Sequence, residues 1–101
     1  MNFEYVYTLE KTEAKARLEA LSEYLENRHG IRCVWDGDNG TIRGKYLVVK
    51  IEGDMRIEEG RVRFSGRDPG LLWRKKATNY MQKKLAIYLD PNTPIEELPR
   101  N

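Results

Sequence analysis

The chain has 101 residues, of which 40% are hydrophobic and 34% are charged, so it is long enough for one domain and too short for two. Its 18 basic and 16 acidic residues give a formal net charge of +2, which excludes a strongly acidic solvating chain and a histone-like polycation. No apolar stretch approaches the roughly 18 residues of a transmembrane span, and the start of the chain has no signal-peptide pattern. We therefore expect a cytoplasmic protein.

The first elements are a strand and a helix. Residues 2–9 alternate in polarity, which predicts a strand with a mostly aromatic face. A helix is predicted from about residue 12 to 29, with Thr12 as its N-cap and Glu13 in its first turn. Gly30 is suited to the left-handed position that ends a helix. The apolar residues at helical spacing are Ala14, Leu18, Leu21 and Leu25, widened by Ala20 and Tyr24.

The middle of the chain has the pattern of an antiparallel meander. Residues 31–36 alternate as a strand, and a turn rich in Gly, Asn and Asp follows at residues 36–40. Residues 41–52 are then expected to form one strand bent at Gly44. In that strand Leu47, Val49 and Ile51 face the core.

Two further short strands are expected before the second helix. Gly53 and Asp54 are predicted to turn the chain, and Glu59 and Gly60 to turn it again. Met55, Ile57, Val62 and Phe64 alternate with polar residues on either side of the second turn.

A second helix is predicted to begin at Asp68, acting as N-cap, with Pro69 in the first helical position, and to end near Leu89. Its apolar stripe comprises Trp73, Ala77, Tyr80, Met81, Leu85 and Tyr88. Residues 90–101 are rich in helix-breaking residues, and we expect them to lie as an extended tail over the body of the domain.

This order predicts an α+β fold, in which two helices cover one face of an antiparallel sheet of four to five strands. Residues 1–89 would form the single domain. Because an apolar sheet face must be covered, both amphipathic helices are expected on the same side.

No catalytic or metal-binding constellation stands out. The single histidine, His29, is placed at a helix C-terminus, where it suits the helix dipole. The single cysteine, Cys33, lies at an apolar position of a predicted strand, so we expect a buried thiol. A chain with one cysteine has no internal disulfide. The turn at residues 36–40 resembles the start of a calcium loop, but the sixth and twelfth residues from Asp36 are Thr41 and Leu47 instead of Gly and Glu. We therefore expect no enzyme activity, no metal and no cofactor.

Charge is unevenly distributed. Residues 61–89 contain eight basic residues and one acidic residue, a local charge of +7. Arg61 and Arg63 share a sheet face, where cross-strand salt bridging is the favoured explanation over an anion-binding surface. The basic flank of the second helix is the candidate interaction surface: Arg74, Lys75, Lys76, Lys83 and Lys84.

Several segments together resemble a family of small bacterial proteins, the polyhydroxyalkanoic acid system proteins. They are the N-terminal strand, the Ala/Leu/Glu/Arg-rich helix that ends at His29-Gly30, Trp35-Asp36-Gly37, Gly60-Arg61-Val62-Arg63-Phe64, and the closing helix from Leu71 to Leu89. The resemblance implies a cytoplasmic, non-catalytic accessory protein associated with polyhydroxyalkanoate storage. The order of elements is also similar to a reduced helix-grip fold, in which START-like domains close a curved sheet over a lipid cavity with a long C-terminal helix.

Three functional hypotheses follow. The first is an accessory module that binds a storage granule or a protein partner through the basic flank. The second is binding of an acyl chain in an apolar pocket, for which the candidate residues are Tyr5, Tyr7, Trp35, Phe64, Trp73 and Tyr80. The third is nucleic-acid binding through the basic half, which the net charge of +2 does not favour. Edge pairing of a small open sheet would permit a homodimer with any of these.

Overall fold

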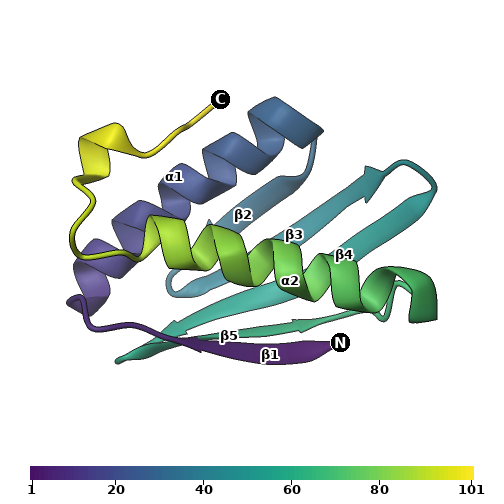
Figure 1. Ribbon diagram of the computed structural model, residues 1–101, viewed down its shortest axis with the longest axis horizontal. Coiled ribbons are helices and arrows are strands. Elements are labelled where there is room, and N and C mark those ends of the chain that lie inside the picture. Colours follow the sequence, from purple (N-terminus) through teal and green to yellow (C-terminus); the bar gives the residue numbers. More distant parts are fainter.

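The computed structural model describes residues 1–101. Along the chain its elements are β1 (Asn2–Val6), α1 (Lys11–His29), β2 (Arg32–Asp36), β3 (Asn39–Tyr46), β4 (Val49–Glu58), β5 (Arg61–Gly66), α2 (Leu71–Tyr88) and a short 3-10 helix, η1 (Ile95–Glu97). Figure 1 shows the helices crossing in front of the strands. The predicted α+β architecture is confirmed.

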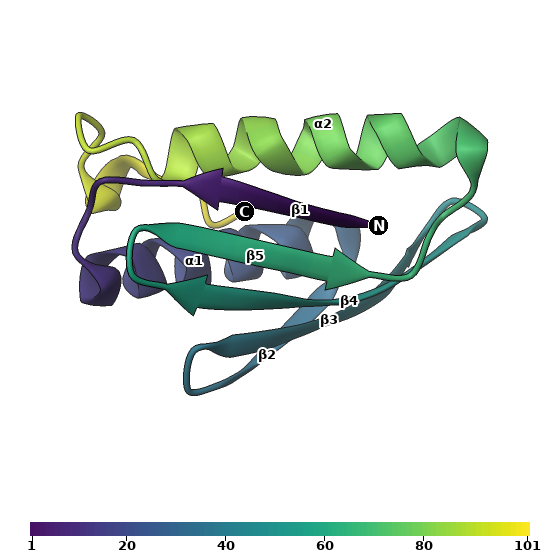
Figure 2. The same ribbon diagram turned by 90° about the horizontal axis from the view of Figure 1, so that it is seen from below.

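The strands form one antiparallel sheet in the order β1-β5-β4-β3-β2, with β1 and β2 as its open edges. Side chains on one face are buried, among them Met55, Ile57 and Val62, whereas those of opposite parity, such as Arg56 and Arg63, are exposed. The two helices therefore cover a single face, and α2 lies alongside the sheet in the view of Figure 2.

The centre of the core joins α1 to the middle strands. Ala14, Leu18 and Leu21 of α1 are fully buried. Across the sheet, Phe64 of β5 pairs with Phe3 of β1, and the two rings stack with their centroids 5.0 Å apart. The cross-strand register thus gathers the inward-facing residues into one continuous apolar layer.

Helix α1 begins one residue before the prediction. Its N-cap is Glu10, without a side-chain capping bond, and Thr12 lies inside the helix, so the predicted Thr12 cap is wrong. The predicted C-terminus is confirmed, because Gly30 has a φ of 69° and its N–H donates to the carbonyl oxygen of Glu26, while the N–H of Ile31 donates to that of Leu25.

The central hairpin differs from the prediction. Strand β3 ends at Tyr46, the chain turns at Leu47 and Val48, and β4 continues without interruption through residues 53 and 54. The predicted bent strand over residues 41–52 and the predicted turn at residues 53–54 are therefore wrong, and Leu47 is exposed instead of facing the core. The reason is pairing: Gly53 is held between β3 and β5, opposite Ile42 and Gly66, so it lies in the middle of a ladder.

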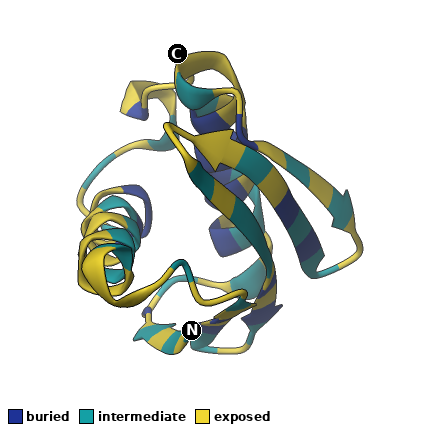
Figure 3. Cartoon of the chain, turned by 90° about the vertical axis from the view of Figure 1, so that its right-hand side faces the viewer, coloured by how far each residue is buried: buried dark blue, intermediate teal, exposed yellow.

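Helix α2 begins later than predicted and lies unevenly on the sheet. Gly70 is its N-cap, so the Asp68 cap and the Pro69 first position are wrong, although the Asp68 carboxylate accepts a hydrogen bond from the N–H of Gly70 at 2.9 Å. Only Leu85 and Tyr88, both in the last turns, are buried. In Figure 3, which views the molecule from the end where α2 begins, the first turns of the helix are largely exposed.

The C-terminal residues return over α1. Leu98 is buried, and the hydroxyl of Tyr88 donates to the carbonyl oxygen of Pro99. Asn27 of α1 donates to the carbonyl oxygen of Arg100 at 2.8 Å. These contacts join the last residues of the chain to both helices.

Candidate functional site

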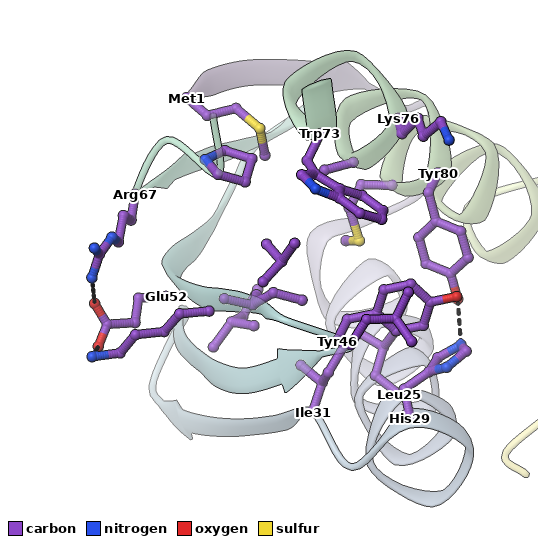
Figure 4. Close-up of a pocket in the computed structure, with 18 of the residues that line it drawn as sticks. Met1, Leu25, His29, Ile31, Tyr46, Glu52, Arg67, Trp73, Lys76 and Tyr80 are labelled. Carbon is purple, nitrogen blue, oxygen red and sulfur yellow. Dashed lines mark hydrogen bonds and ion pairs between the residues drawn. The ribbon is translucent and has the colours of Figure 1, made fainter. Parts of the chain in front are cut away.

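An apolar groove of about 490 Å³ lies between the first half of α2 and the inner face of the sheet. It is lined by 19 residues, of which 13 are hydrophobic. Figure 4 shows Trp73, Lys76 and Tyr80 on α2, with Trp73 directed toward the strands and Tyr80 toward His29 at the C-terminal end of α1. The groove exists because α2 packs tightly only through its last turns.

The floor of the groove is the inner face of β3, β4 and β5. Ile51 of β4 and Phe64 of β5 lie in it. A Cβ atom on Gly53 would lie 3.0 Å from Cζ of Phe64, and one on Gly66 would lie 2.9 Å from Cε1 of the same ring. Because these two paired glycines carry no side chains, the Phe64 ring can approach the backbone of β4 and β5 closely.

One wall of the groove is formed by His29, Tyr46 and Tyr80. Nε2 of His29 lies 3.0 Å from the hydroxyl oxygen of Tyr80, which joins the end of α1 to α2 (Figure 4). The rings of His29 and Tyr46 meet edge to face, with centroids 5.7 Å apart. The ammonium group of Lys84 lies 4.3 Å from the ring centroid of Tyr24, beside the same cluster.

His29 and Tyr80 are both uncharged near neutral pH. Burial, reinforced by the charges of Arg28 and Lys84, lowers the pKa of His29 below its ordinary value. Burial also raises the pKa of Tyr80 to about 12, with the neighbouring Tyr24 adding to the effect. The His29–Tyr80 contact is therefore a neutral hydrogen bond, and the wall offers polar atoms without a fixed charge.

Charged residues also line the groove, with Glu52 and Arg67 across from the His29–Tyr80 wall and Lys76 on α2 (Figure 4). The carboxylate of Glu52 forms ion pairs with Lys50, at 3.2 Å, and with Arg67, at 4.0 Å. Lys76 has no acidic partner, and its ammonium lies 5.5 Å from the ring centroid of Trp73. The lining therefore has three cations against one carboxylate, which favours an uncharged or anionic ligand over a cationic one.

Three of the six predicted pocket residues line the groove: Phe64, Trp73 and Tyr80. The other three lie elsewhere. Tyr7 is buried in the core and donates its hydroxyl hydrogen to the carbonyl oxygen of Glu58, and Tyr5 packs against the same core. The indole N–H of Trp35 donates to the hydroxyl of Ser22 at 2.9 Å.

The predicted basic flank is divided by its contacts. Arg74 pairs with Asp68, whose carboxyl pKa is lowered by that hydrogen bond. Lys76 lines the groove, and Lys84 lies over the aromatic cluster. Lys75 and Lys83 are exposed. None of these four lysines forms an ion pair: Lys75, Lys76, Lys83 and Lys84.

On the outer face of the sheet, the arginines of β5 are paired. Arg61 lies 2.8 Å from the carboxylate of Glu58, and Arg63 lies 3.2 Å from Glu58 and 3.5 Å from Glu4. This confirms the cross-strand salt bridging expected there. The unpaired cations that remain in the basic half are the lysines of α2.

Several groove residues are not marked as part of a site by the helix and strand patterns of the sequence. The position of His29 predicts only an interaction with the helix dipole, yet His29 forms the wall with Tyr80. The pattern around Tyr46 and Leu47 predicts a continuous strand, yet these residues lie at the end of a hairpin beside the groove. One signal could have found them: Leu47-Val48 is an apolar pair between two strands, where a tight turn ordinarily carries Gly, Asn or Asp.

The remaining reactive groups are dispersed. No three His, Cys, Asp or Glu side chains lie close enough together to hold a metal ion. Burial raises the pKa of the Cys33 thiol, which keeps it protonated and unreactive. Neither helix is long and apolar enough to span a bilayer.

Comparison with protein families supplies the context for the groove. The family model described as putative polyhydroxyalkanoic acid system protein matches residues 2–92, which include every strand and both α-helices. Neither the curated proteins nor the solved structures contain a match. Because the family model spans most of the chain, the protein belongs to the polyhydroxyalkanoic acid system protein family.

Proposed function

We propose that this protein is a non-catalytic accessory protein of the polyhydroxyalkanoate system that binds an acyl chain in the groove. The observation that carries the proposal is a largely apolar groove of about 490 Å³ in a domain of only 101 residues. Small-molecule sites typically have volumes of about 300–1,000 Å³, with mostly apolar walls and a few placed polar groups. The groove has both properties.

The polar atoms of the groove suit a hydroxyacyl chain better than a plain hydrocarbon. The apolar floor at Ile51 and Phe64 would hold the methylene groups. His29 and Tyr80 would offer hydrogen bonds to a hydroxyl or ester oxygen at one wall. Lys76, which has no acidic partner and precedes Tyr80 by one turn of α2, would be available to a carboxylate near the same wall (Figure 4).

The test is to block the groove without disturbing the fold. Ala77 lines the groove, whereas Ala86 lies on the exposed surface of the same helix. The unsubstituted protein should bind the fluorescent fatty acid cis-parinaric acid, and 3-hydroxydecanoic acid should displace it. Ala77→Trp should abolish this binding. Ala86→Trp should bind both as the unsubstituted protein does.

Titration of parinaric acid against the three proteins gives the answer, with circular dichroism checking that each is folded. Equal binding by the folded Ala77→Trp variant, or no binding by any of the proteins, would contradict the proposal.

We also propose that the lysines of α2 bring the protein to the storage granule or to an acidic partner there. What favours this surface is the absence of an acidic partner for all four: Lys75, Lys76, Lys83 and Lys84. A fluorescently tagged protein should collect on granules in polymer-accumulating cells, and Lys75→Glu with Lys83→Glu should disperse it. A tagged protein that stays diffuse, or that follows the nucleoid instead, would contradict this assignment.

A further inference from the structure

The end of the molecule at which α2 begins carries two exposed aliphatic pairs. Leu47 and Val48, at the tip of the β3–β4 hairpin, are 68% and 84% exposed. Leu71 and Leu72, in the first turn of α2, are 82% and 85% exposed. Both tips lie at the same end of the long axis in Figures 1 and 2. Since the lining includes Leu47 from one tip and Trp73 beside the other, the groove opens between them.

The two residues at the hairpin tip are not of the types that a tight turn ordinarily contains. Tyr46 pairs with Val49, so Leu47 and Val48 alone make the connection. Leu47 has a φ of 55°, the only positive φ at a residue other than glycine in the chain. Glycine, asparagine or aspartate is strongly preferred there, because a Cβ atom makes this conformation unfavourable. Two aliphatic side chains are thus held in water at a strained position, a combination that points to a function outside the fold itself.

Cations surround both tips. Lys45 and Lys50 are directly opposite each other in the hairpin, one pair below its tip, and like charges in that relation are destabilising. Arg67 precedes the second tip, and Arg74, Lys75 and Lys76 follow it. The acidic residues in these segments are Glu52 and Asp68. The two tips therefore stand within a region of net positive charge.

From this arrangement we infer that the end of the molecule docks on an anionic lipid surface, inserting both aliphatic tips among the acyl chains. Two observations favour a lipid: the cations complement anionic headgroups, and the two aliphatic tips protrude from the molecule. Aliphatic side chains that enter an interface, with Lys and Arg at headgroup level, are the pattern of peripheral membrane binding. In this pose the groove would open toward the apolar phase, although lipid docking does not depend on the groove binding a ligand.

The experiment is flotation with vesicles of two compositions, phosphatidylcholine alone and phosphatidylcholine with about 30% phosphatidylglycerol. The protein should float with the anionic vesicles and not with the neutral ones. Binding should weaken as salt rises from about 0.05 to about 0.5 M, because screening shortens the range of the headgroup attraction. Equal binding to both compositions, or no binding to either, would overturn the inference.

Two variants remove the tips one at a time. Leu47→Gly with Val48→Ser supplies residues that a tight turn prefers, so this variant should remain folded. Glutamine is a good helix former, so Leu71→Gln with Leu72→Gln should leave the exposed first turn of α2 intact. Each should lower the partition coefficient by about tenfold or more, since burial of aliphatic groups drives insertion. Ile87→Gln, at an exposed position near the other end of α2, is the matched control and should leave partitioning unchanged.

Two further readouts separate this inference from ligand binding and from self-association. Leu71 and Leu72 do not line the groove, so their double variant should still bind parinaric acid in solution. If the folded tip variants float as the unsubstituted protein does, lipid docking is wrong. If sedimentation shows a dimer that both tip variants dissociate, the tips belong to an interface with a second copy, and the lipid assignment is overturned.

Discussion

The guanidinium group of Arg17 donates a hydrogen bond from Nη1 to the carbonyl oxygen of Tyr88 at 3.1 Å, joining the middle of α1 to the end of α2. The same side chain is buried and also donates to the carbonyl oxygens of Asp90, at 3.0 Å, and Thr93, at 2.6 Å. The last carbonyl groups of a helix lack partners within the helix, and Arg17 satisfies one of them. This contact fastens one end of α2, while the other end stands away from the sheet and leaves the groove.

Replacing Arg17 by Met should lower the free energy of unfolding by about 3 kcal/mol, because buried carbonyl groups lose their partners and Glu13 loses its ion pair. Urea denaturation at constant pH measures the change. Arg28→Met, at an exposed position of α1, should change stability by less than about 0.5 kcal/mol. Similar stabilities for the two variants would show that Arg17 does not anchor α2.

The His29–Tyr80 contact should make stability depend on pH. The folded pKa of His29 is lowered by burial, so the unfolded chain binds the proton more readily in the window below its ordinary value near 6.5. The stabilisation is complete above that value and is lost as the pH falls toward the folded pKa.

The difference in unfolding free energy between the protein and His29→Gln should therefore shrink as the pH is lowered from about 7.5 to about 5. Guanidinium denaturation at several pH values tests this, and subtracting the variant cancels the contribution of the carboxylates. A difference that stays constant, or that grows toward low pH, would show that the contact is not pH-sensitive.

Leu47→Gly alone should stabilise the protein. Glycine adopts a φ of 55° without the unfavourable Cβ contacts of leucine. This gain is larger than the entropic cost of ordering glycine, so the net stabilisation should be about 0.5–1 kcal/mol. Leu71→Gly is the matched comparison, since it removes another exposed leucine, this one from a helix, and it should destabilise by up to about 1 kcal/mol. Thermal unfolding of both variants should show opposite signs, and a lower Tm for Leu47→Gly would contradict the strain at the hairpin tip.

Gly53→Ala should destabilise the domain by about 1–3 kcal/mol. Its Cβ would lie 2.9 Å from the backbone oxygen of Ser65 and 3.0 Å from the Phe64 ring, so either the ladder between β4 and β5 or the ring must move. A displaced ring would also narrow the groove, so parinaric acid should bind more weakly. Unchanged stability together with unchanged binding would refute the role given to this glycine.

Local sequence features predicted most of the elements correctly. The 3.6-residue spacing of Leu18, Leu21 and Leu25 identified α1, and Gly30 ended it as expected. The alternation of Ile57 and Val62 with charged residues identified β4 and β5. These signals succeed because a helix face and a strand face each impose a period that depends only on the backbone geometry of that segment.

The errors occurred where pairing between segments prevailed over local composition. Gly53 and Asp54 have the residue types of a turn, but β3 and β5 hold them in a strand from both sides. Leu47 and Val48 have the residue types of a strand, but the register between Tyr46 and Val49 makes them a turn. A central strand gains hydrogen bonds on both edges, which outweighs a weak local preference.

The sequence alone determined the fold class, the two helices and the apolar stripe of α2, because each follows from the spacing of residues within one segment. It did not determine the groove. The distance between α2 and the sheet depends on Arg17, Leu85 and Tyr88 holding one end of the helix, and on Gly53 and Gly66 lowering the floor beneath the other. Those contacts join residues far apart in the chain, so only the tertiary structure could decide that the stripe would be left partly uncovered.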